Sequence, residues 1–181
     1  DIDDTGPDFV LSHEFAHLLQ FNLNVAFERT PESTRKAELM ADALSAYYLA
    51  HEDGAFFRSG AIEELTVAAF SVGDCYFNSN SHHGTPNQRQ AAAAYGAALA
   101  TGKQQAATVS NGGTRALAAG AILSPADLVT SFIADFDTFI APDSFESAVC
   151  ENFAVHARTA VTFAGAASEI HGDVSVSPGT S

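Results

Sequence analysis

One stretch constrains this chain more than any other: His13 and His17 stand four residues apart, with Glu14 beside the first, inside an apolar run. The flanking residues 9–11 and 18–21 favour a helix that is buried. Residues i and i+4 share one helical face, so both imidazoles can reach one metal ion. Glu14 would then lie close to a metal-bound water without being a ligand. The alternative is a pair of core histidines bonded to backbone, with Glu14 at the surface.

A second helix is predicted over residues 32–51, with Thr30 as its N-cap and Pro31 at its first position. Glu38 and Asp42 are one turn apart in this helix and share a face. A carboxylate would complete a ligand set of two histidines and one glutamate, which leaves a fourth position open for water. Asp42 could accept the free ring N–H of a ligating histidine. Otherwise the two acids belong to an ordinary solvated helix face.

A third block runs from Ala69 to Arg89 and contains V-G-D at positions 72 to 74 and H-G-T-P-N-Q-R at positions 83 to 89. Thr85 and Gln88 fit a capping box, so a helix is predicted to begin here and to continue to about residue 100. Arg89 falls in the first turn of that helix, where a cation is unfavourable. It therefore needs an acidic partner, for which Asp74 and Asp42 are the candidates.

The histidines outside the first motif differ in their expected roles. His83 precedes the cap and could face the metal site or pin its loop to the core. His82 is expected to be solvated, and the lone histidines are expected at the surface: His51, His156 and His171.

Taken in this order, the three blocks resemble the bacterial neutral zinc metallopeptidase family, which is of the gluzincin type. The matching letters are H-E-F-A-H-L-L-Q, A-E-L-M-A-D-A, and V-G-D followed by H-G-T-P-N-Q-R, within residues 10–96. The resemblance implies a zinc metalloendopeptidase that hydrolyses peptide or protein substrates. It implies one Zn²⁺ ion bound by His13, His17 and Glu38.

The resemblance also assigns the remaining roles at this site. Glu14 is implied as the general base and Asp42 as the group that orients a ligating histidine. An oxyanion-stabilising residue is implied too, with His83 as the candidate and Tyr47 and Tyr48 as its rivals. The competing interpretation is a non-catalytic domain whose zinc is structural and which binds a partner protein.

The expected fold is mainly α, a single zincin-like helical domain with few or no strands and with the helix of the first motif buried. Its parts are a zinc-site half over 1–101, a loop-rich connection over 102–120, C-terminal helices over 121–171 and a flexible tail over 172–181. Helices are predicted near residues 8–26, 32–51, 61–72, 87–101, 125–135 and 144–166.

Charge and cysteine content limit the partners and the compartment. The formal net charge of −14 argues against nucleic acid and anionic membranes as partners. No apolar run is long enough for a membrane span. Cys75 and Cys150 are either buried thiols or a structural disulfide, and the disulfide would place the protein outside a bacterial cell.

The few residues before His13 are too short to build a sheet that could hold a peptide substrate by its edge. We therefore expect weak peptidase activity from this chain alone, with another N-terminal segment or a partner chain completing the cleft.

Overall fold

The computed structural model describes residues 5–55, 59–102, 106–109, 113–115, 122–137, 153–157 and 173–176. Helices dominate these residues, which confirms the predicted mainly α fold. The helices are α1 (Thr5–Asn22), α2 (Pro31–Ala50), α3 (Ser59–Ser71), α4 (Pro86–Ala100) and α5 (Pro125–Asp135). Two short sheets accompany them: β1 (Ala106–Val109) pairs antiparallel with β2 (Gly113–Arg115), and β3 (Phe153–Ala157) pairs parallel with β4 (Asp173–Val176).

Three of the helices begin where the sequence predicts, because each has a capping side chain followed by proline. The hydroxyl of Thr30 accepts from the backbone N–H of Ser33 at the start of α2. Thr85 and Gln88 form the complete capping box of α4, and Ser124 caps α5. Each cap satisfies backbone donors that the first helical turn leaves without partners.

The strands differ from the sequence prediction. β3 falls inside the segment 144–166 that was predicted to be helical, β1 and β2 fall in the predicted loop 102–120, and β4 falls in the predicted tail. The helical spacing of apolar residues near Phe153 was misleading, because this stretch pairs with the distant strand β4, which local spacing does not reveal. The rest of 144–166 lies outside the described residues.

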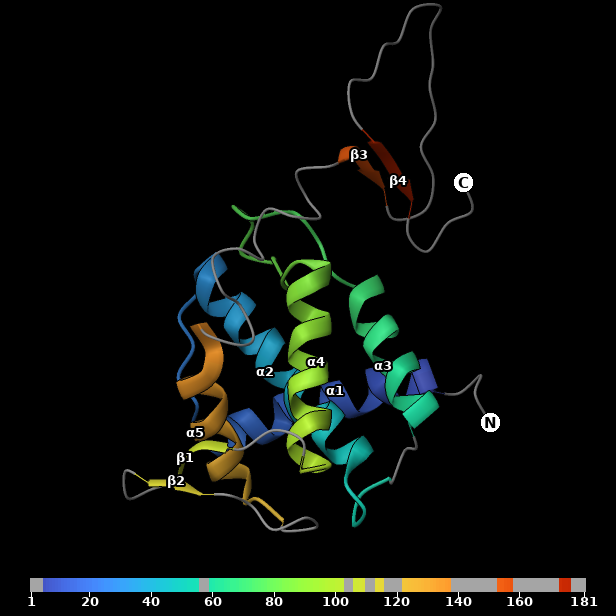
Figure 1. Cartoon of the computed structure of the whole chain (residues 1–181). Helices are drawn as coiled ribbons and strands as arrows, with labels where there is room; N and C mark the ends of the chain where they lie inside the picture. Colours follow the sequence, from blue (N-terminus) through green and yellow to red (C-terminus); the bar gives the residue numbers. More distant parts are fainter. Residues whose placement is uncertain are drawn as a thin grey trace, which may run out of the picture.

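The core of the helical part lies between α2 and α4, which stand side by side with α3 while α1 crosses them (Figure 1). Leu39, Met40 and Ala92 are completely or almost completely buried there. A Cβ atom at Gly96 of α4 would collide with the carbonyl oxygen of Ala43 in α2. Glycine at this position therefore allows the two backbones to approach closely, and α2 becomes a rigid base for its side chains.

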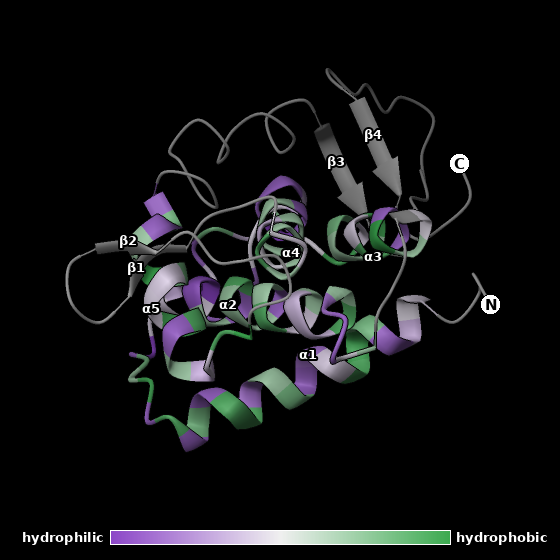
Figure 2. Ribbon diagram, turned by 60° about the horizontal axis from the view of Figure 1, so that its bottom comes forward, coloured by the Kyte–Doolittle hydropathy of each residue, from purple (hydrophilic) through white to green (hydrophobic). Residues whose placement is uncertain are grey.

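Only one face of α1 is buried, so the prediction of a buried helix holds for that face alone. Phe9, His13 and Ala16 face the core. Phe15 and Phe21 are exposed, and Figure 2 shows hydrophobic residues along α1 at the lower edge of the molecule. Within the described part of the chain, no helix is both long and apolar enough to cross a membrane.

Candidate metal centre

Three side chains from two helices converge on one point. The Nε2 atoms of His13 and His17 are 3.1 Å apart. Glu38 places Oε2 3.2 Å from Nε2 of His13 and Oε1 3.4 Å from Nε2 of His17. Ligands at roughly 2.0–2.2 Å from a tetrahedral zinc ion are separated from each other by about 3.3–3.6 Å. These three residues can therefore hold a metal ion, as predicted from their spacing.

The other ring nitrogens of the two histidines fix which nitrogen faces the convergence point. Nδ1 of His13 lies 2.8 Å from Oδ1 of Asp42, and this carboxylate oxygen accepts a hydrogen bond from the ring N–H. Nδ1 of His17 lies 2.9 Å from Oε1 of Gln20, whose amide nitrogen donates to the carbonyl of Ala37. Both Nδ1 atoms can therefore donate, and in its neutral form each imidazole turns a bare Nε2 toward the other two side chains.

This donor set requires a cation at its centre. Two Nε2 lone pairs and the carboxylate of Glu38 are all acceptors, and acceptors at these distances repel one another. Burial lowers the pKa of His13, but hydrogen bonds to Asp42 and Glu38 outweigh burial and raise it to about 9. Burial raises the pKa of Glu38, but its bonds to the two histidines hold it well below the usual range. A proton or a metal ion therefore belongs at this point, and the two compete.

Asp42 is completely buried and has two partners. Besides His13, it accepts from Nε of Arg89 at 2.8 Å and from Nη2 of Arg89 at 2.7 Å. Of the two acidic partners predicted for Arg89, the structure thus selects Asp42. The bidentate pair joins α4 to α2 directly behind a metal ligand, so the capping box that starts α4 also positions the site.

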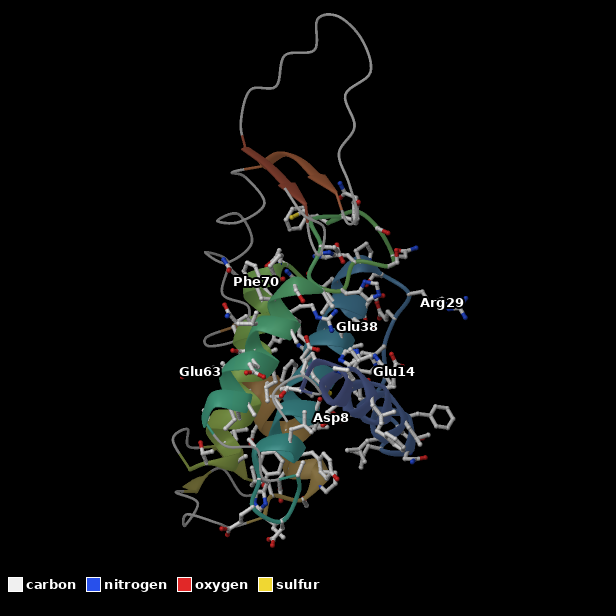
Figure 3. All side chains as sticks on the ribbon, turned by 90° about the vertical axis from the view of Figure 1, so that its right-hand side faces the viewer. Asp8, Glu14, Arg29, Glu38, Glu63 and Phe70 are labelled. Atoms are coloured by element: carbon white, nitrogen blue, oxygen red, sulfur yellow. The ribbon has the colours of Figure 1, made fainter. Side chains whose placement is uncertain are left out.

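Glu14 lies outside the group of three ligands but next to it. It lines a cleft of about 480 Å³ together with His13 and Glu38. Figure 3 shows Glu14 of α1 close to Glu38 of α2. This is the place expected of a base that contacts a water molecule and leaves the metal to other side chains.

His83 lines the same cleft, on the loop between α3 and α4. Its side chain is half exposed, its backbone N–H donates to Oδ2 of Asp74 at 2.9 Å, and its Nδ1 lies 3.4 Å from that oxygen. The bond to Asp74 raises the pKa of His83, against the effect of burial. Asp74 thereby holds the imidazole at the edge of the cleft and favours its protonated form.

Two other histidines were wrongly predicted to be solvated. His82 is buried, and its Nδ1 lies 2.5 Å from Oδ1 of Asp74. His51 is buried at the end of α2, where its Nδ1 accepts from the backbone N–H of Asp53. In both cases the loop next to the ring supplies a hydrogen-bond partner for Nδ1, which lowers the cost of burying that nitrogen.

The two tyrosines proposed as rivals of His83 do not line this cleft. The hydroxyl of Tyr47 accepts from the backbone N–H of Leu123 at 2.9 Å, so it anchors the segment before α5. Tyr48 lines a different hollow, on the other side of α1.

Cys75 is disulfide-bonded, and the other cysteine of the chain, Cys150, lies outside the described residues.

Gln20 is the member of this site that the sequence analysis missed. Its side chain is buried and holds both His17 and the backbone of α2. The signal was present in the sequence, since residue 20 is one turn beyond residue 17 on the same helical face.

Comparison with known protein families, with curated proteins and with solved structures finds no match to this chain.

Proposed function

We propose that this protein is a zinc-dependent peptidase that cleaves peptide bonds in peptide or protein substrates. The observation that carries the proposal is the convergence of His13, His17 and Glu38 at separations that suit tetrahedral coordination, with Glu14 beside them in the same cleft. Two imidazoles and one carboxylate are a ligand set that zinc hydrolases use. The resemblance of the three sequence blocks to neutral zinc metallopeptidases supports the same proposal.

A zinc ion held there would lower the pKa of a bound water and polarise the substrate carbonyl. Glu14 takes the proton from the attacking water and passes it to the leaving amine nitrogen. Asp42 keeps the ring of His13 in the tautomer that offers Nε2 to the metal, and Gln20 does the same for His17. His83, held by Asp74, donates a hydrogen bond to the oxyanion as it forms.

The cleft favours hydrolysis over a purely structural metal site. Structural zinc sites have four protein ligands, whereas catalytic sites keep one position open for water. Among the described residues, the converging group has three members. The cleft of about 480 Å³ next to His13 and Glu38 leaves room for water and for a segment of substrate.

The proposal is tested by metal analysis and a peptidase assay on the same purified protein. We expect about one zinc ion per chain, slow cleavage of an unfolded protein such as casein, loss of this cleavage with a chelator and its recovery with added zinc. Zinc bound at this stoichiometry without any cleavage would favour the non-catalytic alternative.

The disulfide at Cys75 supports the proposal that the protein is exported, because disulfide bonds persist in oxidising compartments.

A further inference from the structure

A second hollow lies between α1 and α2, on the side of α1 that faces away from the metal ligands. It has a volume of about 590 Å³. We call it the α1–α2 groove. Its large apolar residues are Leu11, Phe15, Leu19, Leu44, Tyr48 and Leu49.

The rim of the α1–α2 groove is made of large apolar side chains that the chain leaves in solvent. The exposed fractions are 60% for Leu11, 63% for Phe15 and 56% for Tyr48. Leu11 and Phe15 are one turn apart on α1, and Tyr48 stands across from them on α2. Aromatic and leucine side chains gathered around a hollow, rather than scattered, mark a binding surface.

One end of the groove is acidic. Asp8 lines it at the start of α1, and exposed Glu52 and Asp53 follow the end of α2, just before Ala55, which also lines the groove. The two helices run in opposite directions, since Ser45 contacts Phe9 near the start of α1 whereas Ala37, earlier in α2, contacts Gln20 near its end. The start of α1 and the end of α2 therefore meet at this end, where Figure 3 labels Asp8.

The backbone adds to this negative charge. The last turn of α2 contains no basic residue, so the partial negative charge of its C-terminus has no compensating side chain there. The region around this end of the groove therefore combines the carboxylates of Asp8, Glu52 and Asp53 with the C-terminus of α2. A cationic group is the complement that this region favours.

We propose that the α1–α2 groove binds a helical segment of a partner protein that carries large apolar side chains and lysine or arginine at one end. An apolar groove between two helices accepts the apolar face of a third helix, with anchors at i, i+3, i+4 and i+7. The net charge of −14 disfavours a second copy of this chain as the occupant, because two such molecules repel each other. The proposal does not depend on peptidase activity.

The probe is a fluorescently labelled amphipathic peptide of about 16 residues, with leucine and phenylalanine on one face and two lysines at one end. A second peptide has the lysines at the other end, to allow either direction of binding. Two matched controls replace the lysines with glutamates. We expect saturable binding of at least one lysine peptide by anisotropy, and binding about tenfold weaker for its glutamate control, the effect of roughly one ion pair in a partly buried site.

Two variants locate the binding surface. Phe15→Asp and Tyr48→Asp remove aromatic anchors from opposite walls of the groove, and each is expected to weaken binding by about tenfold or more. Val67→Asp is the control, because Val67 is equally exposed, at 60%, but lies on α3. Circular dichroism checks that each variant is folded.

Binding that survives both variants, or that is equal for lysine and glutamate peptides, would overturn the proposal. Sedimentation of the protein alone provides a further check. Self-association that Phe15→Asp abolishes, with no peptide binding, would assign the groove to a second copy of the chain and would also overturn it.

Discussion

Asp42 joins His13, one of the three converging side chains, to Arg89: its Oδ1 atom lies 2.8 Å from Nδ1 of His13 and 2.7 Å from Nη2 of Arg89. One buried carboxylate thus connects the site on α1 with the first turn of α4. The fold and the metal site share this contact, so a change at Asp42 affects both. It also explains why a motif far along the sequence belongs to the same centre as the two histidines.

Asp42→Asn should lower both metal affinity and stability. The amide cannot balance the charge of Arg89, and removing one member of a buried ion pair costs about 3–5 kcal/mol. Metal affinity should fall by about 10–100-fold, as for other changes behind a ligand. Urea unfolding and zinc titration measure the two effects. An unchanged free energy of unfolding would show that the buried pair contributes nothing to stability.

Glu38→Ala should weaken metal binding more severely than Asp42→Asn, because it removes a ligand itself. We expect a loss beyond the roughly 100-fold typical of residues behind the ligands. Calorimetric titration with zinc compares the two variants, and Glu63→Ala on α3 is the control because Glu63 is an exposed acid on another helix. A larger effect at Asp42 than at Glu38 would mean that the ligand roles on α2 are misassigned.

Asp74→Asn should destabilise the protein at neutral pH and should do so less in acid. Burial raises the pKa of Asp74, but hydrogen bonds to His82 and His83 outweigh burial and hold it far below its usual range. Because the folded-state pKa is lower than the unfolded value of about 4, the ionised carboxylate stabilises the fold above pH 4. That contribution disappears as the pH falls through the folded-state pKa.

Thermal unfolding of the wild type and of Asp74→Asn, from pH 7 down to pH 2.5, measures this dependence. The difference in melting temperature should be largest at pH 7 and should shrink below pH 4. A difference that stays constant over the whole range would contradict the assignment of the stabilisation to the Asp74 carboxylate. Asp127→Asn, at an exposed cap on α5, is a comparison for a surface carboxylate that also accepts a hydrogen bond.

Metal affinity should fall with decreasing pH. The pKa of His13 is raised to about 9 by its acidic neighbours despite burial, so below that pH a metal ion must displace a proton from the cluster. The hydrogen bond that His17 donates to Glu38 also raises the pKa of His17. We expect the affinity to drop about tenfold or more per pH unit between pH 7.5 and 6, with proton release in calorimetry. Affinity independent of pH would exclude protonated imidazoles in the metal-free cluster.

Local spacing was enough to predict side chains that converge at the candidate metal centre and the residues at which several helices start. His13 and His17 are one turn apart on one helix, and so are Glu38 and Asp42, so each pair shares a face whatever the rest of the chain does. The caps at Thr30 and Thr85 are equally local. These features can be predicted from the sequence because they do not depend on which helices contact each other.

Features that depend on contacts between distant segments were harder to predict. The sequence left Arg89 with two candidate partners, because only the packing of α4 on α2 selects Asp42. His82 is buried because the turn after α3 brings it to Asp74, and no periodic pattern marks that turn. β3 was read as helix because its partner strand begins at Asp173, far along the chain.

The most direct test of the proposed function is Glu14→Gln, because Glu14 lines the cleft but is not among the metal-binding residues. The amide keeps the size of the side chain but cannot accept a proton from water. Zinc content by mass spectrometry should stay at about one ion per chain, while the rate of peptide cleavage should fall by about 10²–10⁴-fold. Loss of zinc from this variant, or cleavage at the wild-type rate, would contradict the role of Glu14 as the base.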